Sequence, residues 1–184
     1  MSEPYSLYLR VRLSKRAFER YLASPAADAR HFKDWLPWLG KARMHSFVFT
    51  PDKIAEIARD AHKSSTAEEI GAWTANAWAF ARSHYDELTE TWRFSIAQFS
   101  ENYKEFLEHL PPLRAVDRFK DLPGTDFMLV YDHFWSPNNR YAVLFEFADG
   151  SSRIAGSPGQ GLPFPQRYAE EAQTFVGSLA ADAG

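Results

Sequence analysis

The residue types best suited to acid–base chemistry meet in the segment YDHFW, where Asp132 is followed by His133. Neighbouring residues of a strand point to opposite faces of a sheet, so these two side chains do not form a dyad with each other. A histidine with a carboxylate partner can act as a general base, and Glu146 on the next predicted strand is the candidate partner. The group predicts a small hydrolase that uses His133 with Asp132 or Glu146. The alternative, which we favour, is a structural histidine among aromatic residues.

Metal and cofactor chemistry has less support. Glu105 and His109 are four residues apart and could share an ion on a helix, and His84 could do so with Glu87. Neither pair has a second pair of ligands elsewhere in the sequence, so we predict no metal site. The glycine-rich segment GSPGQGLPFP lacks the lysine and the hydroxyl residue of a phosphate-binding loop, and no G-x-S-x-G motif is present. We therefore predict no cofactor.

Composition excludes several other classes of function. The 184 residues carry a net charge of −3 and show no basic cluster, which argues against a nucleic-acid-binding protein. The sequence has no cysteine, so disulfides, thiolate catalysis and thiolate-bound zinc are excluded. The first residues do not resemble a signal peptide and no apolar run is long enough to cross a membrane. We expect a cytoplasmic protein.

The longest helical pattern covers residues 66–110. Thr66 with Glu69 forms a capping box at its start, and Pro111-Pro112 ends it. A straight helix of that length would be about 66 Å long, which exceeds the diameter of a compact domain. We therefore predict a kink around Ser83–Asp86.

This predicted helical block has two faces. An aromatic residue recurs at every seventh position and is predicted to pack on the core: Trp78, Tyr85, Trp92, Phe99 and Phe106. Acidic residues gather on the opposite side at helical spacing: Glu87, Glu90, Glu101, Glu105 and Glu108. This acidic stripe is either a solvated face or a docking surface for a basic partner.

The remaining elements predict an α+β fold in a single domain, 1–184. Alternating apolar residues indicate an N-terminal strand, a strand near 44–50 and a C-terminal β-meander over 126–156, whose turn lengths make it antiparallel. Shorter helices are predicted over 14–24, 26–40, 51–62 and 166–181. Because strands and helices are partly segregated, we expect a mostly antiparallel sheet packed against the 66–110 block and these helices.

Aromatic residues beside charges are the remaining functional signal. Trp35 and Trp38 flank Pro37, and Trp135 stands at the start of a predicted turn. Tryptophan anchors ringed by charge are typical of protein interfaces, although these residues could instead cover the edge of the core. Since no catalytic motif is present, we predict a non-enzymatic protein-binding module.

The predicted partner is another protein with a basic surface, and homo-oligomerisation remains open. A small bacterial immunity protein that neutralises a toxin by direct binding is the specific hypothesis, on general character alone. The alternatives are the hydrolase described above and an adaptor or chaperone for a secreted effector. No motif assigns the chain to a family.

Overall fold

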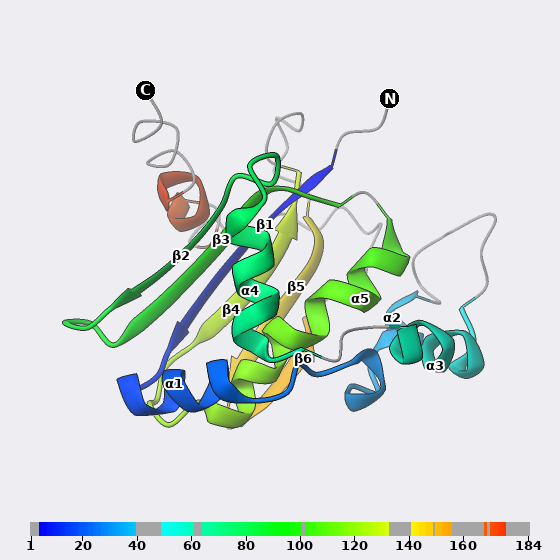
Figure 1. Ribbon diagram of the computed structural model, residues 1–184, viewed down its shortest axis with the longest axis horizontal. Helices are drawn as coiled ribbons and strands as arrows, with labels where there is room; N and C mark the ends of the chain where they lie inside the picture. The colour runs from blue at the N-terminus through cyan, green and yellow to red at the C-terminus, as the bar shows by residue number, and fades with distance from the viewer. Residues whose placement is uncertain are drawn as a thin grey trace.

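The computed structural model describes residues 4–39, 49–60, 64–100, 102–132, 141–148, 150–155, 168 and 170–175. Their central feature is a six-stranded sheet in the order β2-β3-β1-β4-β5-β6, in which every neighbouring pair is antiparallel (Figure 1). The strands are β1 (Tyr5–Arg12), β2 (Ala81–Asp86), β3 (Thr91–Ser100), β4 (Asp126–Tyr131), β5 (Tyr141–Ala148) and β6 (Ser151–Ile154).

One face of the sheet carries the main core. Alternate residues of β1 and β3, among them Leu9, Trp92 and Phe94, are fully buried against helical residues such as Tyr21 and Phe106. Figure 1 shows α4 and α5 lying across this face. The described helical elements are α1 (Lys15–Ala23), η1 (Ala29–His31), α2 (Trp35–Leu39), α3 (Pro51–Asp60), α4 (Thr66–Ala75), α5 (Tyr103–Arg114) and η2 (Ala115–Phe119). None of them is long and apolar enough to cross a membrane.

The prediction of one long helical block over residues 66–110 is wrong. This region contains α4, the hairpin of β2 and β3, and the start of α5. The predicted kink around Ser83–Asp86 lies within β2. Trp92, Phe94 and Ile96 fit an alternating strand pattern, pair with β1 and are fully buried in the core. Pairing with β1 therefore determines that this segment is a strand, although the spacing of its aromatic residues also matches a helix.

The hairpin turn explains why the sequence hid this strand pair. The Asp86 carboxylate accepts from the backbone nitrogens of Leu88 at 2.9 Å and Thr89 at 3.3 Å, and Glu90 takes a positive φ of 48°. An aspartate that bonds two and three residues ahead reverses the chain without glycine or proline. The usual sequence signal of a turn is consequently missing.

The ends of the helices also differ from the prediction. Ser65, not Thr66, caps α4, and it forms the capping box with Glu68. Helix α5 runs through Pro111 and Pro112 to Arg114, so the prolines lie inside its last turn. A proline interrupts the hydrogen bonding of a helix but does not oblige the chain to leave it there.

The other face of the sheet is covered by the C-terminal segment over β1, β4 and β5. Residues 168 and 170–175 are helical. Tyr168, Ala172 and Phe175 pack against Tyr8 and Phe127, and the rings of Tyr168 and Phe127 are stacked at 4.0 Å.

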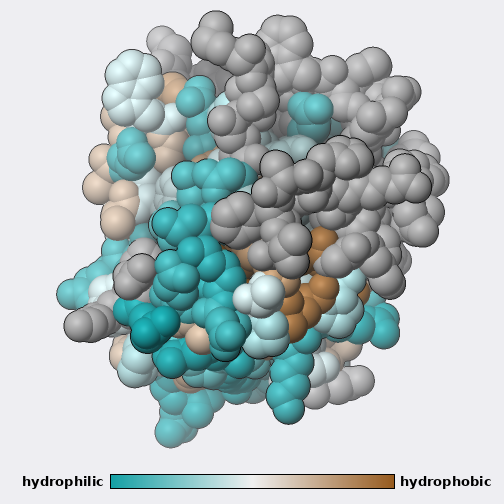
Figure 2. Space-filling model, turned by 90° about the vertical axis from the view of Figure 1, so that its right-hand side faces the viewer, coloured by the Kyte–Doolittle hydropathy of each residue, from teal (hydrophilic) through white to brown (hydrophobic). Residues whose placement is uncertain are grey.

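The predicted α+β fold with an antiparallel sheet is confirmed, as are the N-terminal strand and the meander. The predicted strand near 44–50 falls mostly outside the described residues, and so do the two ends of the predicted 166–181 helix. Seen from the side where α2 and α3 lie in Figure 1, the described surface is largely hydrophilic (Figure 2).

Candidate binding surface

Strand alternation gathers basic side chains on the outer face of β1, β2 and β3, the face opposite the main core. Arg10 lies directly opposite Arg93, and Arg93 lies directly opposite His84 on the next strand. Directly opposite residues are about 4.5–5.5 Å apart at Cα, so these three form one row across the sheet. Arg12 and Arg82 share this face, because they stand two residues away along β1 and β2 respectively.

We call Arg10, Arg12, Arg82, His84 and Arg93 the arginine face. Arg12, Arg82 and His84 are exposed, whereas Arg10 and Arg93 are half-buried. Their proximity is unfavourable for folding, since like charges directly opposite each other destabilise a strand pair. The face therefore concentrates positive potential in a chain of net negative charge.

Arg10 has defined partners on this face. The Arg10 Nε lies 3.2 Å from a carboxylate oxygen of Glu171, and its Nη2 donates to the carbonyl of Thr125 at 2.9 Å. Glu171 also accepts from the Tyr8 hydroxyl at 2.8 Å. Burial, followed by the charge of Glu171, raises the pKa of Tyr8 well above its usual range, so the hydroxyl stays protonated. These contacts hold Arg10 in place beside the C-terminal helix.

Asp86 is the acidic residue at the hairpin end of this face. Its pKa is lowered, first by the hydrogen bonds from Thr89, with a smaller contribution from Arg93. The carboxylate is therefore charged at neutral pH, but it is committed to the hairpin turn. Arg12 lies in the same row of the sheet, on the other side of Thr91.

The largest exposed hydrophobic side chains lie at the two ends of β2. Trp78 is 80% exposed, Phe80 57% and Leu88 97%. Ala79 lies between the two aromatics and is buried, and its carbonyl accepts from the nitrogens of Ala97 at 3.1 Å and of the next residue at 3.2 Å. These hydrogen bonds hold Ala79 against β3, and Phe80 has a φ of +47°. The aromatic side chains on either side of Ala79 face solvent. Aromatic and arginine side chains together are typical of interface hot spots.

The predicted tryptophan anchors are not on the surface. Trp35 is 1% exposed and packs edge-on against Phe145. Trp38 is 3% exposed and stacks on Phe106. The interface prediction for Trp35 and Trp38 is wrong because the sheet and α5 enclose them. Trp135 lies outside the described residues.

The predicted acidic stripe is not one surface, because its helix does not exist. Glu87 and Glu90 lie in the hairpin turn, and Glu87 pairs with Lys15 at 2.9 Å. Two others lie on α5. There the Glu105 carboxylate accepts from the Ser100 hydroxyl, and Glu108 is 3.3 Å from Lys104. Glu101 lies outside the described residues. A binding role for any of these acids stays a prediction.

The hydrolase candidates are only partly placed. His133 lies outside the described residues. Asp132 directly follows β4, whereas Glu146 lies opposite Phe127, five positions earlier along β4. That offset corresponds to about 16 Å along the strand. Glu146 also pairs with Arg153 at 2.8 Å, so it is a poor partner for chemistry near Asp132.

Neither pair considered for a metal acquires further ligands. Glu105 and His109 share α5, as predicted from their spacing. His109 packs between the rings of Trp73 and Phe99. In the described ranges no cluster of three or more residues with metal-binding side chains occurs.

A buried arginine dominates the other end of the sheet. Arg114 is fully buried and donates through both terminal nitrogens to the carboxylate of Asp34, at 2.9 Å each, and through Nε to the Ser152 hydroxyl at 3.0 Å. Its guanidinium lies 4.0 Å from the ring centre of Phe32 and 4.6 Å from that of Trp35. Burial lowers the pKa of Arg114, and the hydrogen bond to Asp34 opposes this.

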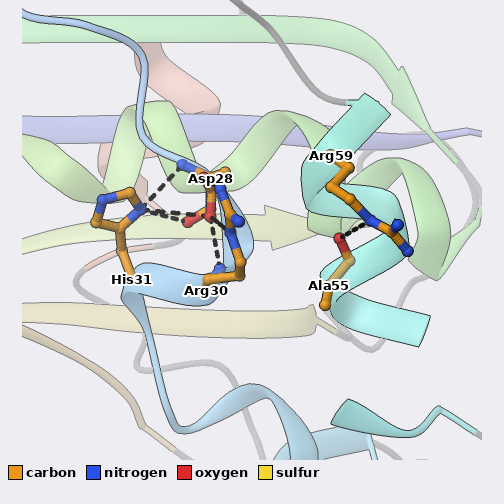
Figure 3. A network of polar contacts seen from close by, with 5 residues as sticks. All are labelled: Asp28, Arg30, His31, Ala55 and Arg59. Carbon is orange, nitrogen blue, oxygen red and sulfur yellow. Dashed lines mark hydrogen bonds and ion pairs between the residues drawn. The ribbon is translucent and has the colours of Figure 1, made fainter. Parts of the chain in front are cut away.

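Arg114, Asp34 and Ser152, which we call the clasp, line a surface hollow of about 410 Å³. Titratable groups around this hollow resemble those of an active site. Their partners are already assigned, however. The His31 Nδ1 accepts from the Asp28 nitrogen at 3.2 Å within a capping box, and Arg30 pairs with the Asp28 carboxylate at 2.7 Å (Figure 3). Asp117, which also lines the hollow, has a pKa raised by burial. The arrangement joins η1, α5 and β6 and presents no nucleophile beside a base.

Sequence reasoning missed the arginine face. Its members come from β1, β2 and β3, and the register of three strands is needed to bring them together. The available signal was the alternation of Arg93 and Ser95 with Trp92, Phe94 and Ile96. Comparison with protein-family models, with curated proteins and with solved structures gave no match.

Proposed function

We propose that the protein is a non-enzymatic protein-binding module whose arginine face receives an acidic surface of a partner protein. The observation that supports this most directly is the row of Arg10, Arg93 and His84 across three strands. Such a row costs folding free energy, and an acidic partner would turn that cost into binding free energy. The exposed Trp78 and Phe80 offer apolar contact beside it.

The charge of this face reverses the partner expected from the sequence. A basic partner followed from an acidic stripe on one helix, whereas the fold places Glu87 and Glu90 in a turn and Glu105 and Glu108 on α5. An acidic protein surface is the better match, since complementary potentials speed association and reject wrong partners.

A protein partner is also a better fit than a nucleic acid. Single-stranded nucleic acids need exposed aromatic rings for base stacking on the basic surface. The aromatic residues next to Arg10 on the outer face, Tyr8 and Phe127, are buried, and the exposed Trp78 and Phe80 lie beyond the end of β2.

The specific form of this proposal is an immunity or inhibitor protein that acts in the cytoplasm by covering its target. Its support is the combination of a charged, aromatic-flanked surface with the absence of assembled catalytic groups among the described residues. An adaptor would bind through the same surface but would leave the activity of its partner intact.

Co-expression with the products of adjacent genes, followed by calorimetry on any complex, tests the proposal. The variant Arg12→Glu/Arg93→Glu should weaken binding about 10- to 100-fold, as expected when interface arginines are reversed. The matched control Arg16→Glu/Arg20→Glu makes the same charge change at exposed positions of α1 and should alter affinity by less than about 3-fold. If the partner protein loses its toxicity when it is bound, the protein is an inhibitor and not an adaptor.

Two outcomes would contradict the proposal. Equal losses in both double variants would assign the effect to net charge and not to the arginine face. Tighter binding of a single-stranded 20-nucleotide RNA than of an acidic partner, measured by fluorescence anisotropy, would point to nucleic acid instead.

A further inference from the structure

The two edges of the sheet are built differently. At the β6 edge, the nitrogen of Ile154 donates to Asp34 at 3.0 Å, and the carbonyl of Ser152 accepts from Arg114 at 3.1 Å. Side chains of the clasp thus occupy backbone groups that another strand could otherwise pair with. The β2 edge has a single ladder neighbour, β3, within the described part of the chain. A strand in that position is a template for a further strand.

The sequence of β2 is complementary to itself. Arg82, His84 and Asp86 alternate along it and share the outer face of the sheet. If two copies pair antiparallel with His84 opposite His84, Arg82 of each copy lies directly opposite Asp86 of the other. This register sets the same two opposite charges against each other twice, as a two-fold axis requires, while the Asp86 carboxylate keeps the hydrogen bonds that it accepts within the hairpin turn.

Other registers lose this match. A shift by one residue would place outer-face side chains against core-face side chains. A shift by two moves Arg82 away from Asp86 and opposite His84 or Leu88. Only with His84 at the centre do both arginines meet aspartates.

Apolar groups beyond the ends of β2 support the same register. Phe80 and Leu88 lie just beyond opposite ends of β2, so in this register Phe80 of one copy and Leu88 of the other lie at the same end of the paired strands. These side chains are 57% and 97% exposed in the single chain. Their contact in a pair would remove apolar area from water at both ends of the strand ladder.

We propose that the protein forms a two-fold symmetric homodimer through antiparallel pairing of β2 with β2. The partner is a second copy of this chain, and the two six-stranded sheets become one continuous sheet. The dimer is separate from the proposed acidic partner and does not depend on it. It would place the arginine faces of both copies on the same side of the joined sheet.

Disulfide trapping tests the register directly, because the chain contains no cysteine. Opposite residues at the two-fold axis have Cα atoms about 4.5–5.5 Å apart, which is within the range a disulfide spans. His84→Cys should therefore form a covalent dimer under mild oxidation. Glu19→Cys, a control at an exposed position of α1 outside the proposed contact, should not.

Sedimentation equilibrium of the full chain tests the charge pairing. Arg82→Glu should raise the dimer dissociation constant about 10-fold or more, because it faces Asp86 with a like charge on both sides of the axis. Arg12→Glu changes an exposed arginine of the same face away from the edge and should leave dimerisation within about 2-fold of the unaltered chain. That variant would impair the proposed acidic partner, so the two proposals fail separately.

Three results would overturn the dimer. The first is a monomer up to several hundred micromolar. The second is equal cross-linking of His84→Cys and Glu19→Cys, which indicates random collision. The third is a dimer weakened equally by Arg82→Glu and Arg12→Glu, which would place the contact on the arginine face and not at the β2 edge.

Discussion

Replacing Arg93 by glutamate should make the fold more stable while it weakens binding. Arg93 lies directly opposite Arg10, so the native chain sets two like charges against each other. Glutamate at this position would replace a repulsive cross-strand pair by an attractive one. Arg93 is thus expected to lower the stability of the fold, and its proposed role is to bind the acidic partner.

The size of this effect follows from the geometry of the strand pair. With charged groups about 6 Å apart, the Coulomb energy lies between about 0.7 kcal/mol in water and about 2.8 kcal/mol near a protein surface. Measured cross-strand pairs are smaller, about 0.2–1 kcal/mol each. Glu171 already offsets part of the Arg10 charge at 3.2 Å. We therefore expect Arg93→Glu to raise the free energy of unfolding by about 0.5–1 kcal/mol.

Urea denaturation followed by circular dichroism measures this change. The gain should be present at 0.1 M salt, where the screening length is about 10 Å, and should be largely lost at 1 M, where it is about 3 Å. Arg93→Gln removes the repulsion without adding an attraction and should give about half of the gain. A less stable Arg93→Glu variant at low salt, or a gain that persists at high salt, would refute the electrostatic reasoning.

Five other substitutions, two of them controls, test the core and the surroundings of Arg114 by the same denaturation assay. Arg114→Met should lower the free energy of unfolding by about 3 kcal/mol because it leaves a carboxylate partner and a serine hydroxyl unpaired, whereas exposed Arg118→Met should change it by less than about 0.5 kcal/mol. Trp35→Ala should cost about 3–5 kcal/mol and Trp78→Ala close to nothing, and equal costs would contradict their placement in the core and in solvent. Burial raises the pKa of Asp117 in the folded chain, so its charged form opposes folding as the pH rises above the ordinary carboxyl range. Asp117→Asn should therefore be more stable than the unaltered chain at pH 7, and the gain should be smaller at pH 3. A gain that is larger at pH 3 than at pH 7 would refute this reasoning.

The elements that sequence reasoning predicted correctly carry their signal locally. In β1, Leu7, Leu9 and Val11 alternate with polar residues, and only one periodicity fits them. The β5–β6 turn contains Gly150 at a φ of +72°, as a tight hairpin requires. Each of these features could be assigned without knowing what packs against it.

The hairpin of β2 and β3 has no such local signal. Trp92, Ile96 and Phe99 fit a helical stripe, and Phe94 alone falls outside it, so only Phe94 distinguishes a strand from a helix within that set. The reversal at Asp86 uses a side-chain hydrogen bond in place of glycine. Long-range pairing with β1 then fixes the strand, and no window of the sequence contains that pairing.

The candidate site was missed for the same reason, and two predicted anchors were misplaced by it. Trp35 and Trp38 could be assigned to the surface only while the sheet that covers them was unknown. The basic residues were counted as dispersed, because Arg10 and Arg93 are far apart in the sequence and adjacent only in the sheet. Net charge, an average over the whole chain, carries no information about such a face.

The ends of the sheet show how one chain can both avoid and invite strand pairing. The buried ion pair of Arg114 and Asp34 satisfies backbone groups at the β6 edge. Desolvation of the two charges costs folding free energy, whereas charged residues on the surface would also prevent strand pairing there. At the β2 edge the same chain places Arg82 and Asp86, which deter a random strand but match a copy of themselves. A protein under selection only to stay monomeric would have no use for that match. The difference between the edges therefore favours a β2 that is kept open for its own copy.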